Sequence, residues 1–169
     1  ELIDFVDFIY KTFGFKYSIE VSTRPEKAMG SKSAWDKAES ALKEALKDKK
    51  IEFKINEGDG AFYGPKIDFH LRDAIGRTWQ CGTIQLDFSM PEKFDLEYIG
   101  EDGKKHRPIM LHRAIYGSLE RFLGILIEHY SGAWPLWLSP VQIIIIPLSE
   151  KFNDYGEKVK IELTENEIR

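Results

Sequence analysis

The sequence has few of the features that mark secreted, membrane-spanning or strongly nucleic-acid-binding proteins. Cys81 is its one cysteine, so the chain alone forms neither an internal disulfide nor a cysteine-rich zinc site. Its longest apolar run, Ile143–Ile146, is far shorter than the about 20 residues of a transmembrane helix. The formal net charge of -4 gives no overall attraction to nucleic acid or anionic membranes, so any such contact must be local. We expect a cytoplasmic protein without a targeting segment.

The composition is that of a globular chain with one sizeable core. Of the 169 residues, 43% are apolar and 31% are charged, which argues against disordered and low-complexity classes. This length allows one complete domain and a remnant of a second. The chain begins without methionine inside an established amphipathic pattern, so we expect a piece of a longer protein.

The first half of the chain predicts helices that alternate with half-buried strands. Apolar residues at helical spacing predict a helix over residues 2–13, and strict alternation predicts a strand over residues 15–21. Residues 23–31 contain proline and glycine and are expected to form a loop. Ser33 is the expected N-cap of the next helix, which runs to about residue 49.

Three short alternating segments follow and predict consecutive strands over residues 51–55, 67–71 and 78–89. Because short turns join them, an antiparallel sheet is favoured. The segment 111–130 has only Gly117 and Gly124 as helix breakers and a broad apolar face, which predicts one long, largely buried helix.

The character of the pattern changes near a short linker that Pro135 and Pro140 bracket. Residues 141–148 form an apolar run of strand length, typical of a strand covered on both faces of a parallel sheet, and a polar, helical segment follows. A parallel strand and one helix cannot bury themselves, so residues 141–169 are expected to begin a second, α/β domain. The overall expectation is an α+β fold, with a first domain over residues 1–140.

The glycine-rich connection at residues 58–68 is the first place where chemistry is indicated. Its glycines allow the backbone to approach a ligand closely, Tyr63 offers a hydroxyl, and Lys66 offers a cation for phosphate or carboxylate. Spacing alone favours the simpler interpretation, a glycine-rich hairpin turn.

A second cluster is the glutamine-containing strand at residues 79–88. Regular alternation would place Gln80 and Gln85 on opposite faces, but Gly82 permits a β-bulge that turns both amides to one side. An amide can both donate and accept, which suits adenine, ribose or amino-acid recognition. A sheet face that tolerates polar residues beside solvent is the alternative, and Cys81 is interpreted as a small buried hydrophobe.

The segment 112–122 forms the third cluster, at the head of the expected long helix. His112 there can ligate a metal or make a core contact. Arg121 lies beside an apolar stripe, so its guanidinium needs an anion, a carboxylate or a planar ring, and Glu120 is the local candidate. Mixed charges at residues 23–27 are those of an ordinary surface loop.

These motifs together resemble a known family. The segment Gly117–Phe122 after His112–Ala114 resembles motif 3 of class II aminoacyl-tRNA synthetases, and more narrowly that of the bacterial-type threonyl-tRNA synthetase family. Segments 22–27, 60–66 and 79–88 resemble that family in the same order, and the resemblance covers about residues 1–150.

The resemblance implies a class II synthetase-like antiparallel sheet with flanking helices, followed by the start of an α/β anticodon-binding domain. It also implies an activity: ATP, with Mg²⁺, activates threonine as threonyl-adenylate, and the threonyl group passes to the terminal adenosine of tRNA(Thr). The resemblance further implies a homodimeric parent protein.

The resemblance assigns roles to particular residues. The motif 3 arginine, Arg121, would stack on adenine and help to hold the triphosphate. By the same resemblance, Lys66 and Gln80 would lie around the adenylate, and Tyr63 would lie near the amino group of the substrate. Gln85 and Ser118 would line the pocket, and His112 would bind a zinc ion. His112 would be one of three protein ligands of zinc, and the hydroxyl of threonine would bind the metal where isosteric valine cannot.

Several parts of the family pattern do not occur in this sequence. No segment resembles motif 1 or motif 2, so two zinc ligands and the arginine for the α-phosphate are missing. We therefore expect the chain alone to be inactive or poorly active. The alternatives are a non-catalytic synthetase-like module that binds RNA or protein, and a prolyl or glycyl enzyme of the same subgroup.

Overall fold

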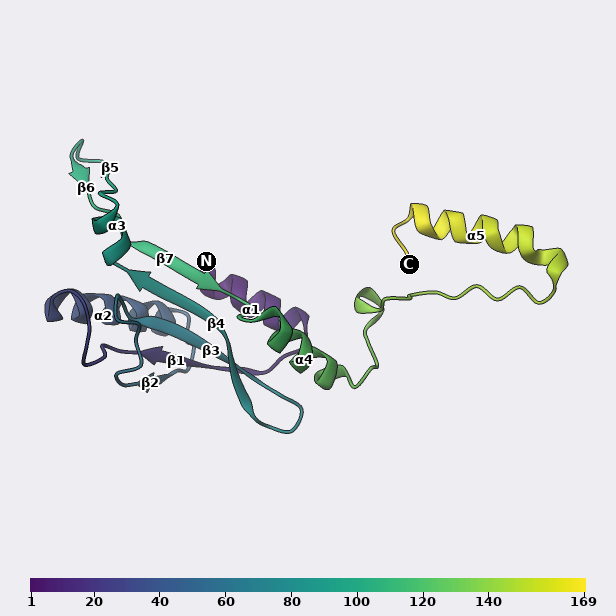
Figure 1. Ribbon diagram of the computed structural model, residues 1–169, viewed down its shortest axis with the longest axis horizontal. Coiled ribbons are helices and arrows are strands. Elements are labelled where there is room, and N and C mark those ends of the chain that lie inside the picture. The colour runs from purple at the N-terminus through teal and green to yellow at the C-terminus, as the bar shows by residue number, and fades with distance from the viewer. The chain divides into compact units, whose positions relative to one another are not determined.

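The computed structural model describes residues 1–169 and divides into two units, Glu1–His129 and Tyr130–Arg169. The first unit combines one mixed sheet with flanking helices (Figure 1), as the expected α+β class requires. No helix in the structure combines the length and the apolar character needed to cross a membrane.

The sheet of the first unit has five strands in the order β2-β1-β3-β4-β7. All neighbours are antiparallel except β1 and β2, which are parallel because α2 forms a crossover between them. The predicted antiparallel pairing of consecutive strands is thus confirmed for β3 and β4 and wrong for β2, which lies beside β1 and not beside β3. The strands are β1 (Tyr17–Ser22), β2 (Lys54–Asn56), β3 (Lys66–Arg72), β4 (Thr78–Asp87) and β7 (Met110–Ala114).

One face of this sheet is apolar and is covered by two helices, α1 (Leu2–Thr12) and α2 (Lys32–Asp48). Both helices are amphipathic and turn their apolar side inward, since Tyr10 and Trp35 are fully buried. The Tyr10 ring lies edge-on to Phe69 of β3, with ring centroids 6.3 Å apart. The fully buried side chains of this core include Val21, Ile67, Phe69, Leu71 and Leu46.

The predicted helix over residues 111–130 is wrong in its first part. Met110–Ala114 is strand β7, and only Leu119–Tyr130 is helix, α4, with one side buried. The two are separated by a turn in which Gly117 has a φ of 65°, a left-handed conformation that glycine adopts readily. As a strand, residues 110–114 form backbone hydrogen bonds with β4. This long-range pairing overrides the helical spacing of the local sequence.

Other predicted boundaries are corrected by smaller amounts. The Ser31 hydroxyl, rather than that of Ser33, accepts the capping hydrogen bond from the N–H of Ala34 at 3.2 Å. The strand expected over residues 51–55 is found at Lys54–Asn56. Beyond β4 the chain forms a short helix and a small hairpin at one end of the sheet (Figure 1): α3 (Ser89–Lys93), β5 (Tyr98–Ile99) and β6 (Lys105–His106).

The second unit contains short 3-10 helices, η1 (Leu136–Leu138) and η2 (Glu150–Phe152), and the helix α5 (Asn153–Glu165). The expected helical segment at the C-terminus is confirmed, whereas the expected strand over residues 141–148 is not formed. A strand requires a neighbour that completes its hydrogen-bond ladder, and here the N–H groups of Gln142 and Ile143 donate to the carbonyl oxygen of Arg169 instead.

Gly64 marks a close approach of the 58–65 loop to the sheet. A Cβ at Gly64 would clash with the backbone carbonyl of Leu86 on β4, which cannot move without breaking the strand. We expect Gly64→Ala to lower the free energy of unfolding by about 1–3 kcal/mol or more, measured by urea denaturation.

Gly124 on α4 provides the matched control, because a Cβ there meets no atom within 4 Å. Gly124→Ala should raise the free energy of unfolding by about 0.5–1 kcal/mol, the helix preference of alanine. Equal effects of the two substitutions would contradict the close approach at Gly64.

Candidate functional site

A β-bulge in β4 brings the two glutamines to one face of the sheet. The pairing shifts between Phe69–Gly82 and His70–Gln80, so Cys81 is the extra residue on β4. Beyond the shift Gln85 pairs with Lys66, which lies on the same face of β3 as His70. Gln80 and Gln85 therefore share a face, and the bulge predicted from Gly82 is confirmed.

We call this side of the sheet the polar face, and its centre is the buried carboxylate of Asp68. The Oδ2 atom accepts a hydrogen bond from Ser22 at 2.7 Å and lies 2.9 Å from the Lys66 ammonium. The Oδ1 atom accepts from the Gln80 amide at 2.6 Å and from the Thr83 hydroxyl at 3.0 Å. Four donors from three strands thus converge on one side chain, which is 1% exposed.

Lys66 lies almost buried on this face, with its ammonium between two carboxylates. Its Nζ atom is 2.9 Å from Asp68 Oδ2 and 3.2 Å from Asp59 Oδ2 of the preceding loop. Burial alone would lower the pKa of Lys66, but the hydrogen bonds and charges of Asp68 and Asp59 outweigh it and raise the pKa above its ordinary value. The lysine is therefore held as a cation on the polar face.

Tyr63 reaches the same face from the 58–65 loop. Its hydroxyl donates a hydrogen bond to Gln85 Oε1 at 2.7 Å, and its ring lies edge-on to the His112 ring with centroids 6.1 Å apart. The loop is more than the simple hairpin turn that spacing favoured, because it places Tyr63 and Asp59 beside residues of β3, β4 and β7.

His112 lies on strand β7 opposite Gln85, and not at the head of a helix as expected. Its Nε2 atom is 2.8 Å from Oδ2 of Asp87, whose Oδ1 accepts from the N–H groups of Ser89 and Met90. Burial alone would raise the pKa of Asp87, but the hydrogen bonds from His112, Met90 and Ser89 outweigh it and lower the pKa below its usual range. Asp87 is therefore a charged carboxylate, and its contact with Nε2 orients the imidazole of His112.

No group of three histidine, cysteine or carboxylate side chains in this chain forms a potential metal site. A catalytic zinc ion requires three protein ligands, so the residues present do not fit a complete zinc site by themselves. Cys81 is buried, and burial raises the pKa of its thiol, as the interpretation of a small buried hydrophobe requires.

Ser118 and Arg121 lie at the start of α4. The Ser118 hydroxyl accepts from the N–H of Arg121 at 3.2 Å and donates to Glu120 Oε2 at 2.8 Å, as an N-cap does. The expectation that Glu120 is the partner of Arg121 is wrong, because no contact joins their side chains. The guanidinium instead donates to the carbonyl oxygen of Gln80 at 3.1 Å and lies 5.8 Å from the centre of the Trp79 ring.

Sequence reasoning missed the acidic residues that hold this site, Asp59, Asp68 and Asp87. The signal for Asp68 was its alternation with Lys66 in β3, which places both on one face. Asp87 alternates with Gln85 in β4 in the same way. An acid two residues from a functional strand residue is therefore the pattern that would have indicated Asp68 and Asp87, whereas Asp59 lies in a loop and has no such signal.

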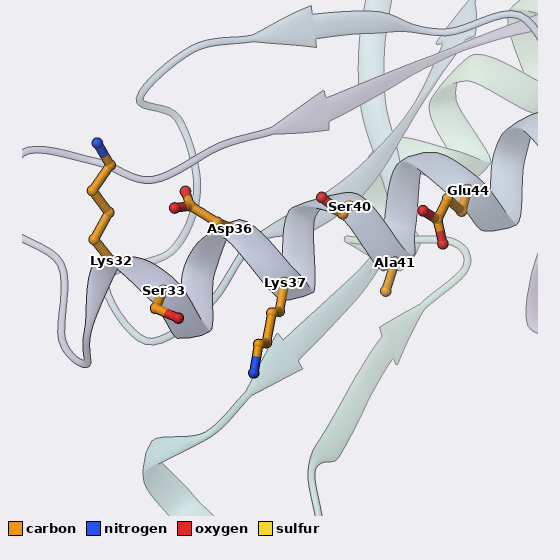
Figure 2. Close-up of a pocket in the computed structure, with 7 residues that line it drawn as sticks. All are labelled: Lys32, Ser33, Asp36, Lys37, Ser40, Ala41 and Glu44. Atoms are coloured by element: carbon orange, nitrogen blue, oxygen red, sulfur yellow. The ribbon is translucent and has the colours of Figure 1, made fainter.

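A shallow hollow lies along the solvent side of α2, away from these residues. Figure 2 shows its lining, in which the side chains of Lys32 and Lys37 point away from each other. Such divergent charges are those of the polar side of an amphipathic helix, and we assign no function to this surface. Its lining residues are Lys32, Ser33, Asp36, Lys37, Ser40, Ala41 and Glu44.

Residues 1–130 contain the whole of this sheet, the helices on its apolar face and the polar face with its lysine, glutamines, tyrosine and histidine. The family model described as tRNA synthetase class II core domain (G, H, P, S and T) matches residues 1–130. The chain belongs to this family.

Curated relatives and a solved structure are similar to nearly the whole chain. A threonine–tRNA ligase from Acetivibrio thermocellus is 64% identical over 168 residues, and one from Finegoldia magna is 66% identical over 167 residues. The RNA binding domain of threonyl-tRNA synthetase from Cryptosporidium parvum superposes with a TM-score of 0.91 at 46% identity, over 98% of this chain and 42% of that chain. Each of these two matches spans 99% of this chain but only 26% of the curated relative.

The Asp87–His112 pair predicts a pH-dependent stability. Because the pKa of Asp87 is lower in the folded than in the unfolded chain, its charge stabilises the fold above about pH 4, and this contribution is lost as the pH falls through the folded pKa. We expect Asp87→Asn to lower the free energy of unfolding by about 1.5–3 kcal/mol at pH 7 and by much less at pH 3, measured by urea denaturation.

Asp95→Asn is the control, since the Asp95 side chain is 83% exposed and pairs with Arg107 at the surface. Its effect should stay below about 0.5 kcal/mol at both pH values. A loss for Asp87→Asn that is the same at pH 7 and pH 3 would contradict a stabilising charge at Asp87.

Proposed function

We propose that this chain is the later part of the catalytic core of an enzyme that joins threonine to tRNA(Thr). In this reaction ATP and threonine form threonyl-adenylate, and the threonyl group then passes to the tRNA. The proposal is supported by curated relatives of more than 60% identity that are named threonine–tRNA ligases. Because the chain spans about a quarter of their length, the complete activity would belong to a longer cytoplasmic, homodimeric protein.

The convergence of side chains on the polar face is the observation that carries this proposal. Tyr63, Lys66, Gln80, Gln85 and His112 come from one loop and three strands, yet all lie on this face. A hydrophobic core does not require these side chains, because burying a lysine and two amides costs free energy that apolar side chains do not cost. A surface of this chemistry can hold the phosphates, ribose and amino group of an aminoacyl-adenylate.

We assign the individual roles as follows. Arg121 would stack on adenine and hold the triphosphate, and Lys66 and Gln80 would contact the adenylate. Tyr63 would lie near the amino group of threonine, with Gln85 beside it through the hydrogen bond that joins them. Ser118 would contribute to the pocket wall from the start of α4.

Metals would complete the site from outside this chain. His112 would supply one ligand of a zinc ion, with the Nε2 atom held by Asp87 and Nδ1 as the ring nitrogen available to the metal. When bound, that zinc would supply a coordination site for the hydroxyl of threonine. Mg²⁺ would arrive with ATP, since it is held largely by phosphate oxygens and water.

We also propose the domain division of the longer protein. Residues 1–140 would belong to the catalytic core, and residues 141–169 would begin the anticodon-binding domain. The apolar side chains Ile144, Ile146 and Leu148 are between 75% and 93% exposed, which supports a continuation of the protein that covers them.

The activity is tested by threonine-dependent exchange of pyrophosphate into ATP. The chain alone should show no exchange, since it supplies one zinc ligand and half of the ATP contacts, whereas the parent enzyme should be fully active. In the parent, His112→Ala should lower both the zinc content and the discrimination against valine, measured by metal analysis and by exchange with each amino acid.

Exchange by the chain alone at a rate near that of the parent would contradict the proposed division of the site. Exchange driven by proline or glycine instead of threonine would contradict the substrate.

A second candidate function is an RNA-contacting module without catalysis, which is favoured by the description of the Cryptosporidium parvum chain as an RNA binding domain. The parent assay separates the two. A parent that binds tRNA(Thr) but exchanges no pyrophosphate would support the module.

A further inference from the structure

The hairpin that joins β3 to β4 holds an anchored tryptophan beside Arg121. Asp73 begins this hairpin, its N–H donates to the carbonyl oxygen of Arg77, and its carboxylate is fully buried. Its Oδ2 atom accepts from the Trp79 indole N–H at 2.9 Å and from Arg77 Nε at 2.6 Å. The hydrogen bond from its N–H to the buried Asp73 carboxylate therefore fixes the edge of the indole.

The faces of this indole contact two guanidinium groups. Arg77 Cζ lies 5.4 Å from the ring centroid, and Arg121 Cζ lies 5.8 Å from it. Arg77 is tied to the hairpin and reaches Glu128 of α4 at 3.6 Å, so its place is determined by carboxylates. The guanidinium of Arg121 forms no ion pair with a carboxylate and instead contacts the Trp79 ring and the carbonyl oxygen of Gln80.

We infer that Trp79 and Asp73 are positioning residues that aim the Arg121 guanidinium at ATP. This inference rests on the proposed function, in which Arg121 binds the nucleotide. Trp79 supplies a flat surface for the guanidinium, and Asp73 holds that surface in place from its edge. Both residues would act through Arg121, since Trp79 contacts the guanidinium and Asp73 contacts Trp79.

The physical reason is the freedom of an exposed arginine. Arg121 lies at the surface, where a long side chain samples many rotamers that do not bind nucleotide. A cation–π contact and one hydrogen bond to Gln80 restrict it before the ligand arrives, so less freedom is lost on binding. Loss of the ring should therefore weaken ATP binding without altering the threonine site.

The same hairpin offers a matched control. Ile75 lies between Asp73 and Arg77 in the sequence, its side chain is 69% exposed, and it takes no part in these contacts. Ile75→Ala thus changes the hairpin without changing the support of Arg121.

The experiment uses the parent enzyme and compares Trp79→Leu, Trp79→Phe and Ile75→Ala. We expect Trp79→Leu to raise the KM for ATP about 2- to 30-fold, the range of a partly exposed cation–π contact, with the KM for threonine unchanged. Trp79→Phe keeps a ring but loses the hydrogen bond to Asp73, so its KM for ATP should lie between wild type and Trp79→Leu. Ile75→Ala should match wild type, and circular dichroism should show that each variant is folded.

A double-mutant cycle that combines Trp79→Leu with Arg121→Ala shows whether Trp79 acts through the arginine. The ATP dissociation constant is measured by calorimetry for the wild type, both single variants and the double variant. We expect Trp79→Leu to have no further effect once Arg121 is alanine.

The outcomes distinguish the two proposals. If the wild-type parent shows no threonine-dependent exchange, the proposed function fails. If the wild type is active but Trp79→Leu leaves the KM for ATP unchanged, or weakens ATP equally with and without Arg121, the positioning role is overturned. A Trp79→Leu variant that does not fold leaves the decision to Trp79→Phe in the same cycle, where an unchanged KM for ATP overturns the role.

Discussion

The buried carboxylate of Asp68 is the constraint on which the polar face depends. A buried carboxylate costs several kcal/mol unless charge and hydrogen bonds compensate it. Ser22, Lys66, Gln80 and Thr83 provide that compensation from β1, β3 and β4, so three strands must keep their relative register. The same contacts fix the side chains of Lys66 and Gln80, and thus one interaction serves both the fold and the site.

Much of the sheet could be predicted from the sequence, because β1, β3 and β4 alternate clearly between apolar and polar residues. The bulge was also accessible, since Gly82 between Gln80 and Gln85 is the residue type that a strand irregularity favours. Strand β7 was not accessible, because residues 110–114 continue without a break into the helical spacing of α4. Only the pairing with β4, a long-range contact, decides between strand and helix there.

The site residues illustrate the same limit. Tyr63, Lys66 and the glutamines were singled out by residue type, but the carboxylates that hold them were not. Alternation along a strand gives the face on which Asp68 and Asp87 lie, but it does not show that they are buried. Arg121 shows a further difficulty. Its nearest acidic neighbour in the chain, Glu120, accepts a hydrogen bond from Ser118. The partners of the guanidinium, Trp79 and Gln80, lie about 40 residues away on β4.

The bulge at Cys81 also divides β4 into two stretches whose side chains alternate in different phases. From Thr83 to Asp87 the strand pairs with β7 as well as β3, whereas from Thr78 to Gln80 it pairs with β3 alone. The face of the sheet that each stretch presents is thus determined by its own pairing. The hairpin can therefore change at positions outside the Asp73–Trp79–Arg121 contacts, such as the exposed Ile75, while pairing with β7 keeps the orientation of the stretch that carries Gln85.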